Sequence, residues 1–266
     1  MIDNSVEFAD SQMHKKSKLD YFRNSRKNTD SLAFFTLPET VGIFKSKLKV
    51  DLISAKACLI VRNNPLKRQN NAFLKRAFDI VISSLVIVFI LSWLVPLLAV
   101  LIKRDSSGPV FYKQKRTGRN NKTFQCFKFR TMSYEKNAQF IAATKNDLRV
   151  TKIGRFLRKT SLDEFPQFFN VLLGDMSIVG PRPHPIKLNE DYQNKVEKYM
   201  LRHIIKPGIT GLAQAKGYRG EVSSTLTMRQ RIKIDIFYVE NWSMWLDIKI
   251  IMLTALNIVQ GDKNAY

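Results

Sequence analysis

Residues 81–102, with the sequence VISSLVIVFILSWLVPLLAVLI, form a run of 22 positions without a charged side chain. A helix needs about 20 apolar residues to cross a bilayer, and this run meets that length. The alternative is a helix in a soluble core, but a helix apolar on all sides over this length would need a very large core. The run therefore predicts a membrane protein with most of its mass in water.

Basic residues stand at both ends of this segment. Lys75 and Arg76 precede it, and Lys103 and Arg104 follow it. Because positive charge marks the cytoplasmic side of a membrane segment, a simple span would normally be asymmetric. The flanks favour a re-entrant helix over residues 72–104, which enters one leaflet and returns to the cytoplasm. A kinked full span is the alternative.

Pro96 offers a position for the bend of this helix. Its ring removes a backbone donor and clashes with the carbonyl of Ser92, four residues earlier. The Ser92 hydroxyl could bond to a nearby backbone group and stabilise the bend. We therefore expect the helix to break at Ser92 and Pro96.

The charge balance narrows the possible partners. The chain of 266 residues carries 44 Lys plus Arg against 22 Asp plus Glu, a net charge of +22. Such a surface attracts nucleic acid, anionic lipid or phosphorylated substrates. The sequence has no RRM, KH, zinc-finger or clear helix-turn-helix signature, so an anionic membrane is expected in place of nucleic acid. Cys58 and Cys126 are isolated, which favours a reducing compartment.

The remaining chain predicts an α+β fold that is mostly helical. Residues 1–71 are polar and basic and are expected to form an N-terminal extension, and residues 105–266 form the water-soluble domain. The segments VFYKQKR and KTFQCFKFRTM flank the turn TGRNN and predict a β-hairpin. The last stretch predicts two helices broken near Asn241. Trp242 and Trp245 in this stretch suit either a membrane interface or ordinary core packing.

Alternation along FKFR, residues 127–130, places the aromatic rings on one face and Lys128 and Arg130 on the other. One interpretation is a cationic face that meets phosphates or lipid headgroups. The other, which we favour from the pattern alone, is a half-buried strand with a solvated face.

The stretch TSLDEFPQFFN, residues 160–170, places two carboxylates side by side. Ser161 and Glu164 match a helix capping box, in which Asp163 would only complement the helix dipole. Pro166 argues against that interpretation, because it would be the fifth residue of the capped helix, where a backbone donor is expected. A helix that starts near Pro166 would leave both acids just before its positive end, where anions bind.

Adjacent acids among many cations have a coherent chemistry. A carboxylate can attack phosphorus and form an acyl phosphate. The negative charge of a diphosphate would repel that nucleophile unless Mg²⁺ on a second carboxylate, or nearby arginine, neutralises it. Arg158 and Arg182 are candidates for phosphate clamps. His184 and His203 are expected to be structural.

From about Leu74 to Gly261, roughly 70% of its length, the chain resembles the bacterial sugar transferases, the monotopic polyprenyl-phosphate phosphoglycosyl transferases. The resemblance rests on the order and spacing of several motifs: KRAFDI before the apolar segment, GPVFYKQKRTG, FKFRTM, IGRFLRKTSLDEFPQFFNVLLGDMSIVGPRP, KPGITGLAQ and YVENWSMWLDIKI.

The resemblance implies an enzyme that transfers a sugar-1-phosphate from a UDP-sugar to undecaprenyl phosphate and releases UMP. The reaction would take place at the cytoplasmic face of the bacterial inner membrane and begin the synthesis of an exopolysaccharide, a capsule or the O-antigen of lipopolysaccharide. It also implies a re-entrant membrane helix and interfacial amphipathic helices around a cytoplasmic catalytic domain.

The resemblance also assigns roles to residues of this chain. Asp163 would be the nucleophile that forms a phosphosugar-enzyme, and Glu164 would be the Mg²⁺ ligand. Further positions match the family's substrate-binding residues: Arg158 before the dyad, Pro181, Arg182 and Pro183 in the PRP motif, and Arg219 in GYRGE.

The sequence departs from the family pattern at the expected bend, where Trp93 follows Ser92 and the proline comes only at position 96. The form GYRGE is most similar to members that transfer glucose-1-phosphate, so UDP-glucose is the first expectation for the donor.

Two alternative functions stay open. The lipid phosphate could attack directly while the dyad only binds metal, or the chain could be a basic membrane-anchored scaffold that binds acidic lipid or nucleic acid without catalysis. A homo-oligomer is compatible with the sequence.

Overall fold

The structure, a computed structural model, describes residues 57–134, 144, 147–218, 220 and 224–260. The chain separates into two units, Met1–Asp51 and Leu52–Tyr266, and all described residues belong to the second. Residues 57–63 are helical, and Ala57 and Ile60 are buried in the main core. The rest of the predicted extension before residue 57 lies outside the described residues.

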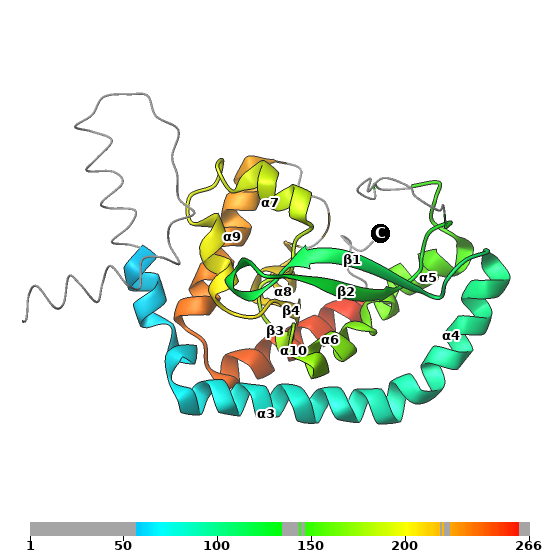
Figure 1. Cartoon of the computed structure of the whole chain (residues 1–266), viewed down its shortest axis with the longest axis horizontal. Coiled ribbons are helices and arrows are strands. Elements are labelled where there is room, and N and C mark those ends of the chain that lie inside the picture. Colours follow the sequence, from blue (N-terminus) through cyan, green and yellow to red (C-terminus); the bar gives the residue numbers. More distant parts are fainter. Residues whose placement is uncertain (1–56, 135–143, 145–146, 219, 221–223, 261–266) are drawn as a thin grey trace, which may run out of the picture. The chain divides into compact units, whose positions relative to one another are not determined.

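The described part is mostly helical with two small sheets, as the sequence predicts (Figure 1). Its longer elements, in chain order, are α3 (Gln69–Val86), a π-helical segment (Ile87–Leu91), α4 (Ser92–Asp105), β1 (Phe111–Thr117), β2 (Thr123–Phe129), α5 (Lys152–Lys159), α6 (Gln167–Leu173), β3 (Ser177–Val179), α7 (Ile186–Tyr192), β4 (Gly208–Thr210), α8 (Leu212–Ala215), α9 (Thr225–Glu240) and α10 (Met244–Gln260). Short 3₁₀ turns cover Pro65–Lys67, Arg119–Asn121, Leu162–Glu164 and Tyr199–Ile204.

The apolar segment lies in one helix of 37 residues, Gln69–Asp105, built from α3, the π segment and α4. Within the described residues it is the one helix long and apolar enough to cross a membrane, judged by length and composition. Figure 1 shows the helix curving, so that α4 turns toward α5 while α3 runs beneath α6 and α10.

The expected helix break at Ser92 and Pro96 is wrong in one respect, because the backbone stays helical throughout. The π segment ends directly before Ser92, and the Ser92 hydroxyl donates to the carbonyl of Val88 at 2.6 Å, as expected. A π turn and a proline are both causes of helix bending. A widened turn therefore accommodates the proline without interrupting the helix.

Polar side chains of α3 form an ion pair and hydrogen bonds with three other elements. The Lys75 amine meets the Asp247 carboxylate of α10 at 2.6 Å. The Arg76 guanidinium donates to the carbonyls of Val171 and Leu172 at 2.6 and 2.9 Å, at the end of α6. Asp79 accepts hydrogen bonds from the hydroxyl of Ser177 and the amide of Ile178, both at 3.0 Å, on β3.

The other end of the helix packs against the same unit. Leu98 and Ile102 of α4 are buried with Phe129 and Leu157 in a second apolar cluster. Asp105 accepts a hydrogen bond from the amide of Ile153 at 2.9 Å. Both ends of the helix are thus fixed to one compact unit, while its other face exposes large apolar side chains: Phe73, Val81, Leu85, Val88, Phe89, Trp93, Leu97 and Val100.

The predicted hairpin is confirmed, with β1 and β2 antiparallel and Gln114 opposite Cys126. The second sheet, the parallel pair β3 and β4, brings two glycines into close contact. A Cβ on Gly208 would lie 2.1 Å from the amide nitrogen of Gly180, closer than any side chain permits. These glycines allow the backbone after β3 to turn tightly beside β4.

The predicted break near Asn241 is also confirmed, since α9 ends at Glu240 and α10 begins at Met244. The two tryptophans differ. Trp242 is buried in the main core, and its indole donates to Asp247 at 3.1 Å. Trp245 is 80% exposed, so core packing explains only Trp242, and an interfacial role for Trp245 stays a prediction.

We expect Asp247→Ala to lower the free energy of unfolding by about 3–5 kcal/mol, because the buried Lys75 cation would lose its carboxylate. Tyr238 and Trp242, which both donate to Asp247, would lose an acceptor as well. Chemical denaturation of the detergent-solubilised protein measures the effect. The matched variant Asp191→Ala, on the exposed face of α7, should change stability by less than about 0.5 kcal/mol. Equal stabilities of the two variants would contradict the structural role of the pair.

Candidate active site

The two adjacent carboxylates lie in a 3₁₀ turn between α5 and α6. The turn spans Leu162–Glu164, and α6 begins at Gln167 with Pro166 as its N-cap residue. The expectation that the helix starts near Pro166 is therefore confirmed. The capping-box interpretation of Ser161 is wrong: its backbone is left-handed, with φ 58°, and its side chain makes no capping hydrogen bond. A non-glycine residue in this conformation is strained, and such strain is frequent at functional sites.

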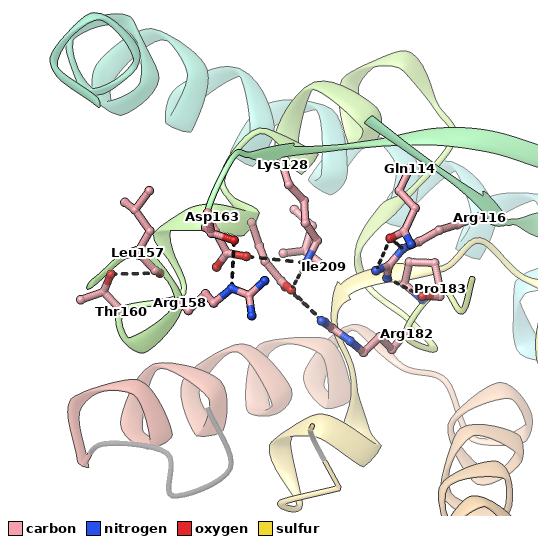
Figure 2. A network of polar contacts seen from close by, with 12 residues as sticks. Gln114, Arg116, Lys128, Leu157, Arg158, Thr160, Asp163, Arg182, Pro183 and Ile209 are labelled. Carbon is pink, nitrogen blue, oxygen red and sulfur yellow. Dashed lines mark hydrogen bonds and ion pairs between the residues drawn. The ribbon is translucent and has the colours of Figure 1, made fainter. Parts of the chain in front are cut away.

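Both carboxylates are buried. Figure 2 shows the cationic side chains of Lys128 and Arg158 directed toward Asp163. The Glu164 Oε1 atom accepts from the Lys128 amine at 2.7 Å and from Arg182 Nη2 at 2.6 Å. Its Oε2 atom accepts from Arg182 Nη1 at 3.1 Å, which makes the pair with Arg182 bidentate. The Lys128 amine also lies 3.7 Å from Asp163 Oδ2. Lys128 thus forms ion pairs with both acids.

The sequence pattern correctly placed Lys128 and Arg130 on the same face of the strand. The preferred prediction that this face is exposed to solvent is wrong. Lys128 reaches the dyad, and Arg130 is buried and donates to the carbonyls of Ser106 and Ile102 at 2.7 and 3.2 Å, where α4 ends. The alternation was the only signal available. Which element packs against a strand face depends on contacts between distant parts of the chain.

The PRP turn, Pro181–Pro183, carries Arg182 and is held from two sides. On one side, Arg116 Nη1 of β1 donates to the Pro183 carbonyl at 2.6 Å, and the Gln114 side chain accepts from the same guanidinium (Figure 2). On the other, Arg202 Nη2 donates to the Arg182 carbonyl at 2.5 Å. These contacts fix the backbone from which Arg182 reaches the dyad.

The charge of Arg182 is secured by its partners. Burial by itself would lower the pKa of this guanidinium, but the Glu164 carboxylate, with a smaller contribution from Asp163, raises it above its usual value. Arg182 therefore remains a cation at every pH at which the protein is folded. The same attraction holds Glu164 in place.

The other residues matched by the resemblance are placed as follows. Arg158, on α5, lies beside Asp163 in Figure 2, and its Nε atom donates to the Thr131 hydroxyl at 2.9 Å. Pro181 and Pro183 are buried in the PRP turn. Arg219 lies outside the described residues.

His184 and His203 are buried away from the dyad, which agrees with the structural role expected for them. His184 Nδ1 lies 2.6 Å from the Tyr199 hydroxyl, which donates to Asn189 at 2.8 Å. Burial, followed by the nearby Arg202 cation, holds the pKa of His184 well below its usual value. The same two causes lower the pKa of His203 to about 3.

The donor set near the dyad suits a metal ion that is shared with substrate. In the described ranges no group of three or more His, Cys, Asp or Glu side chains could hold a metal. Magnesium is typically bound by one or two carboxylates together with water and substrate phosphates, without a cage made only of protein. Asp163 and Glu164 supply such carboxylates, but both Glu164 oxygens accept from Arg182, so a magnesium ion held by Glu164 and a diphosphate would have to displace at least one of these donors.

The buried histidines predict an acid-sensitive fold. Because the folded pKa of His203 lies below its unfolded value of 6.5, the unfolded state takes up a proton first as the pH falls. The contribution of His203 to the free energy of unfolding should therefore be complete above about pH 6.5 and be lost progressively as the pH falls toward 3. Between pH 7 and 5 this histidine should account for a loss of about 2 kcal/mol.

Denaturation curves of wild type and His203→Gln at pH 7, 6 and 5 measure this contribution. The variant should show a shallower fall of stability with pH than the wild type. Identical slopes for the two proteins would show that the pKa of His203 is the same in the folded and unfolded states.

Comparison with known proteins places this arrangement in a family. The family model for bacterial sugar transferases matches residues 70–261. The chain is 51% identical, over 207 residues, to the UDP-glucose:undecaprenyl-phosphate glucose-1-phosphate transferase of Klebsiella pneumoniae, covering 77% of this chain and 43% of that protein. It is 41% identical over 232 residues to a protein of the same name from Caulobacter vibrioides, covering 86% of each.

A third relative is the UDP-N-acetylgalactosamine-undecaprenyl-phosphate N-acetylgalactosaminephosphotransferase of Aeromonas hydrophila, 42% identical over 194 residues, which cover 71% of this chain and 44% of that protein. The chain thus spans less than half the length of the Klebsiella and Aeromonas relatives. The family match extends from the start of α3 to the end of α10 and includes the dyad, the hairpin and the PRP turn. The chain belongs to the bacterial sugar transferase family.

Proposed function

We propose that this protein transfers a sugar-1-phosphate from a UDP-sugar to undecaprenyl phosphate and releases UMP. The observation that carries the proposal is the buried pair Asp163 and Glu164, set against the cations Lys128 and Arg182. Family membership supports it, and the names of two relatives favour UDP-glucose as the donor. The product, a polyprenyl-diphosphate sugar, would begin the synthesis of a surface polysaccharide.

In the first step, a carboxylate oxygen of Asp163 attacks the phosphorus that carries the sugar. The bond from this phosphorus to the bridging oxygen breaks, UMP leaves with the electron pair, and the sugar phosphate remains bound to Asp163 as an acyl phosphate. In the second step, a phosphate oxygen of undecaprenyl phosphate attacks the same phosphorus. Asp163 leaves as a free carboxylate, and the new diphosphate joins lipid and sugar.

The cations near the dyad reduce the electrostatic repulsion between the attacking carboxylate and the substrate. A carboxylate and a diphosphate repel each other, and the repulsion is strong in a buried site with little water to screen it. The Lys128 amine lies between the two acids, at 2.7 Å from Glu164 and 3.7 Å from Asp163. Arg182, and Arg158 beside the dyad, would contact phosphate oxygens of the bound substrate.

Glu164 suits a different role from Asp163. Both of its oxygens accept from Arg182, so its orientation is fixed by a bidentate pair. We assign Glu164, together with substrate phosphates, to magnesium binding. When bound, magnesium neutralises the developing charge on the leaving phosphate.

The long helix supports placement at one face of the inner membrane, with the catalytic unit in the cytoplasm. Lys75 and Asp79 fix its first half, and Ile102 and Asp105 fix its last turns, to the same compact unit. Contacts from both halves of the helix to one unit support the proposal that its two ends lie on the same side of a bilayer. The exposed apolar face between them would enter one leaflet and return.

The re-entrant arrangement predicts labelling from one side only. Lys75 is buried, so the accessible positions are Arg68 and Lys103, each replaced by cysteine in a Cys58→Ser background. A membrane-impermeant maleimide should label Arg68→Cys and Lys103→Cys in inverted vesicles and neither in intact spheroplasts. Phe89→Cys, in the π segment, should resist the reagent from both sides. Labelling of positions 68 and 103 from opposite sides would establish a full span.

The covalent step predicts a complete loss of function in Asp163→Asn. Purified protein in vesicles with undecaprenyl phosphate, magnesium and a panel of UDP-sugars should release UMP and form a lipid-linked sugar. Asp163→Asn should lower UMP release by about 1,000-fold or more. Asp191→Asn, the same exchange on the exposed face of α7, should retain the wild-type rate.

Trapping separates the two-step mechanism from direct attack by the lipid phosphate. Without undecaprenyl phosphate, intact-protein mass spectrometry should find one sugar-phosphate on the wild type, at Asp163, and none on Asp163→Asn. Turnover without any such adduct would support direct attack. The lack of both turnover and a UDP-sugar shift in thermal stability would support a scaffold without catalysis.

A further inference from the structure

A second group of cations lies at the far end of α6 from the dyad. Arg76 of α3, Arg119 of the hairpin turn and Lys206, just before β4, approach one another there; we call these three residues the α6 cation cluster. The seven residues of α6 separate it from Glu164 by about 10 Å along the helix axis. A phosphate bound at this cluster would therefore not be the reacting phosphate.

Gly174 lies beside two of these cations. It ends α6 with a left-handed backbone, at φ +95°. A Cβ at this position would lie 3.6 Å from both Arg76 Nη2 and Lys206 Nζ, so the two cationic nitrogens flank one point.

The Lys206 amine is poorly compensated. Within the ranges that the structure describes, no hydrogen bond or ion pair reaches it. Burial, then the positive charge of Arg76 and, more weakly, of Arg119, lowers the pKa of Lys206. Asp79 and Asp175 offset part of this repulsion, but Asp79 already accepts hydrogen bonds from Ser177 and Ile178. An anion between the cations would relieve the repulsion directly.

The surroundings of the cluster indicate the kind of anion. Phe73 and Leu74 of α3, next to Arg76 along the helix, are 75% and 51% exposed. Leu172 and Leu173, at the end of α6, are 39% and 69% exposed, and the Leu172 carbonyl accepts from Arg76. Cations bordered by exposed apolar side chains on two neighbouring helices are complementary to an anionic headgroup with acyl chains below it.

We propose that the α6 cation cluster is a binding site for the headgroup phosphate of an anionic phospholipid. The phosphate would contact Arg76 and Lys206, and the acyl chains would cover Phe73 and Leu173. This inference rests on the proposed membrane placement but not on the proposed chemistry at Asp163. The lipid would fix the start of α3 and the end of α6 at the membrane surface.

The test is lipid binding to the full-length protein without turnover. Short-chain phosphatidylglycerol is titrated into the delipidated, detergent-solubilised protein, and native mass spectrometry measures the bound fraction, with phosphatidylcholine as the neutral comparison. Lys206→Met should weaken phosphatidylglycerol binding about fivefold, the effect of one basic residue near an anionic headgroup. Lys187→Met, the same exchange on the exposed surface of α7, should leave it unchanged.

Two further variants and a competition experiment complete the test. Lys206→Arg should retain binding, and Arg119→Met, a change at an exposed position, should weaken it even if Lys206→Met unfolds the protein. Equal binding by Lys206→Met, Arg119→Met and Lys187→Met would overturn the site. Competition by undecaprenyl phosphate in place of phosphatidylglycerol would overturn its assignment to a phospholipid. A failure of phosphosugar trapping at Asp163 would leave these binding results unaffected.

Discussion

The buried contact between Lys75 and Asp247 connects the long helix to the unit that carries the candidate site, and the arrangement of that site depends on it. A buried amine needs a carboxylate, and a buried carboxylate needs further donors, which Tyr238 and Trp242 supply. The Tyr238 hydroxyl also lies 3.1 Å from the carbonyl of Val179, the last residue of β3. The PRP turn begins two residues later, so a chain of direct contacts links α3 to the backbone that carries Arg182.

Charge balance is the second constraint on the site. Two adjacent carboxylates could not both remain ionised in a buried turn without cations close by. Arg182 reaches them from the PRP turn and Lys128 from the hairpin, so three separate parts of the chain meet at Glu164. In the proposed function, the same cations that stabilise the folded acids would contact the phosphates of the substrate. Stability and proposed function therefore use the same interactions.

Much of this could be predicted from local patterns. The hairpin, the start of α6 near Pro166 and the break near Asn241 follow from turn residues, proline geometry and periodicity, which act over a few positions. Two expectations were wrong. Ser161 matched a capping box but adopts a left-handed backbone, and Lys128 looked solvated but reaches a carboxylate 36 residues away. For Lys128, a contact distant in sequence outweighed the local preference.

The sequence by itself determined that this protein has a long apolar helix with basic flanks, a pair of acids beside a helix start, and the motifs of its family. Only the tertiary structure decided what those features contact. Lys75 is not simply a flanking charge, because it is paired with Asp247 across the core. The helix bends without breaking, and both of its ends meet one unit. Composition and spacing specify local conformation, but long-range packing selects the partners of each buried charge.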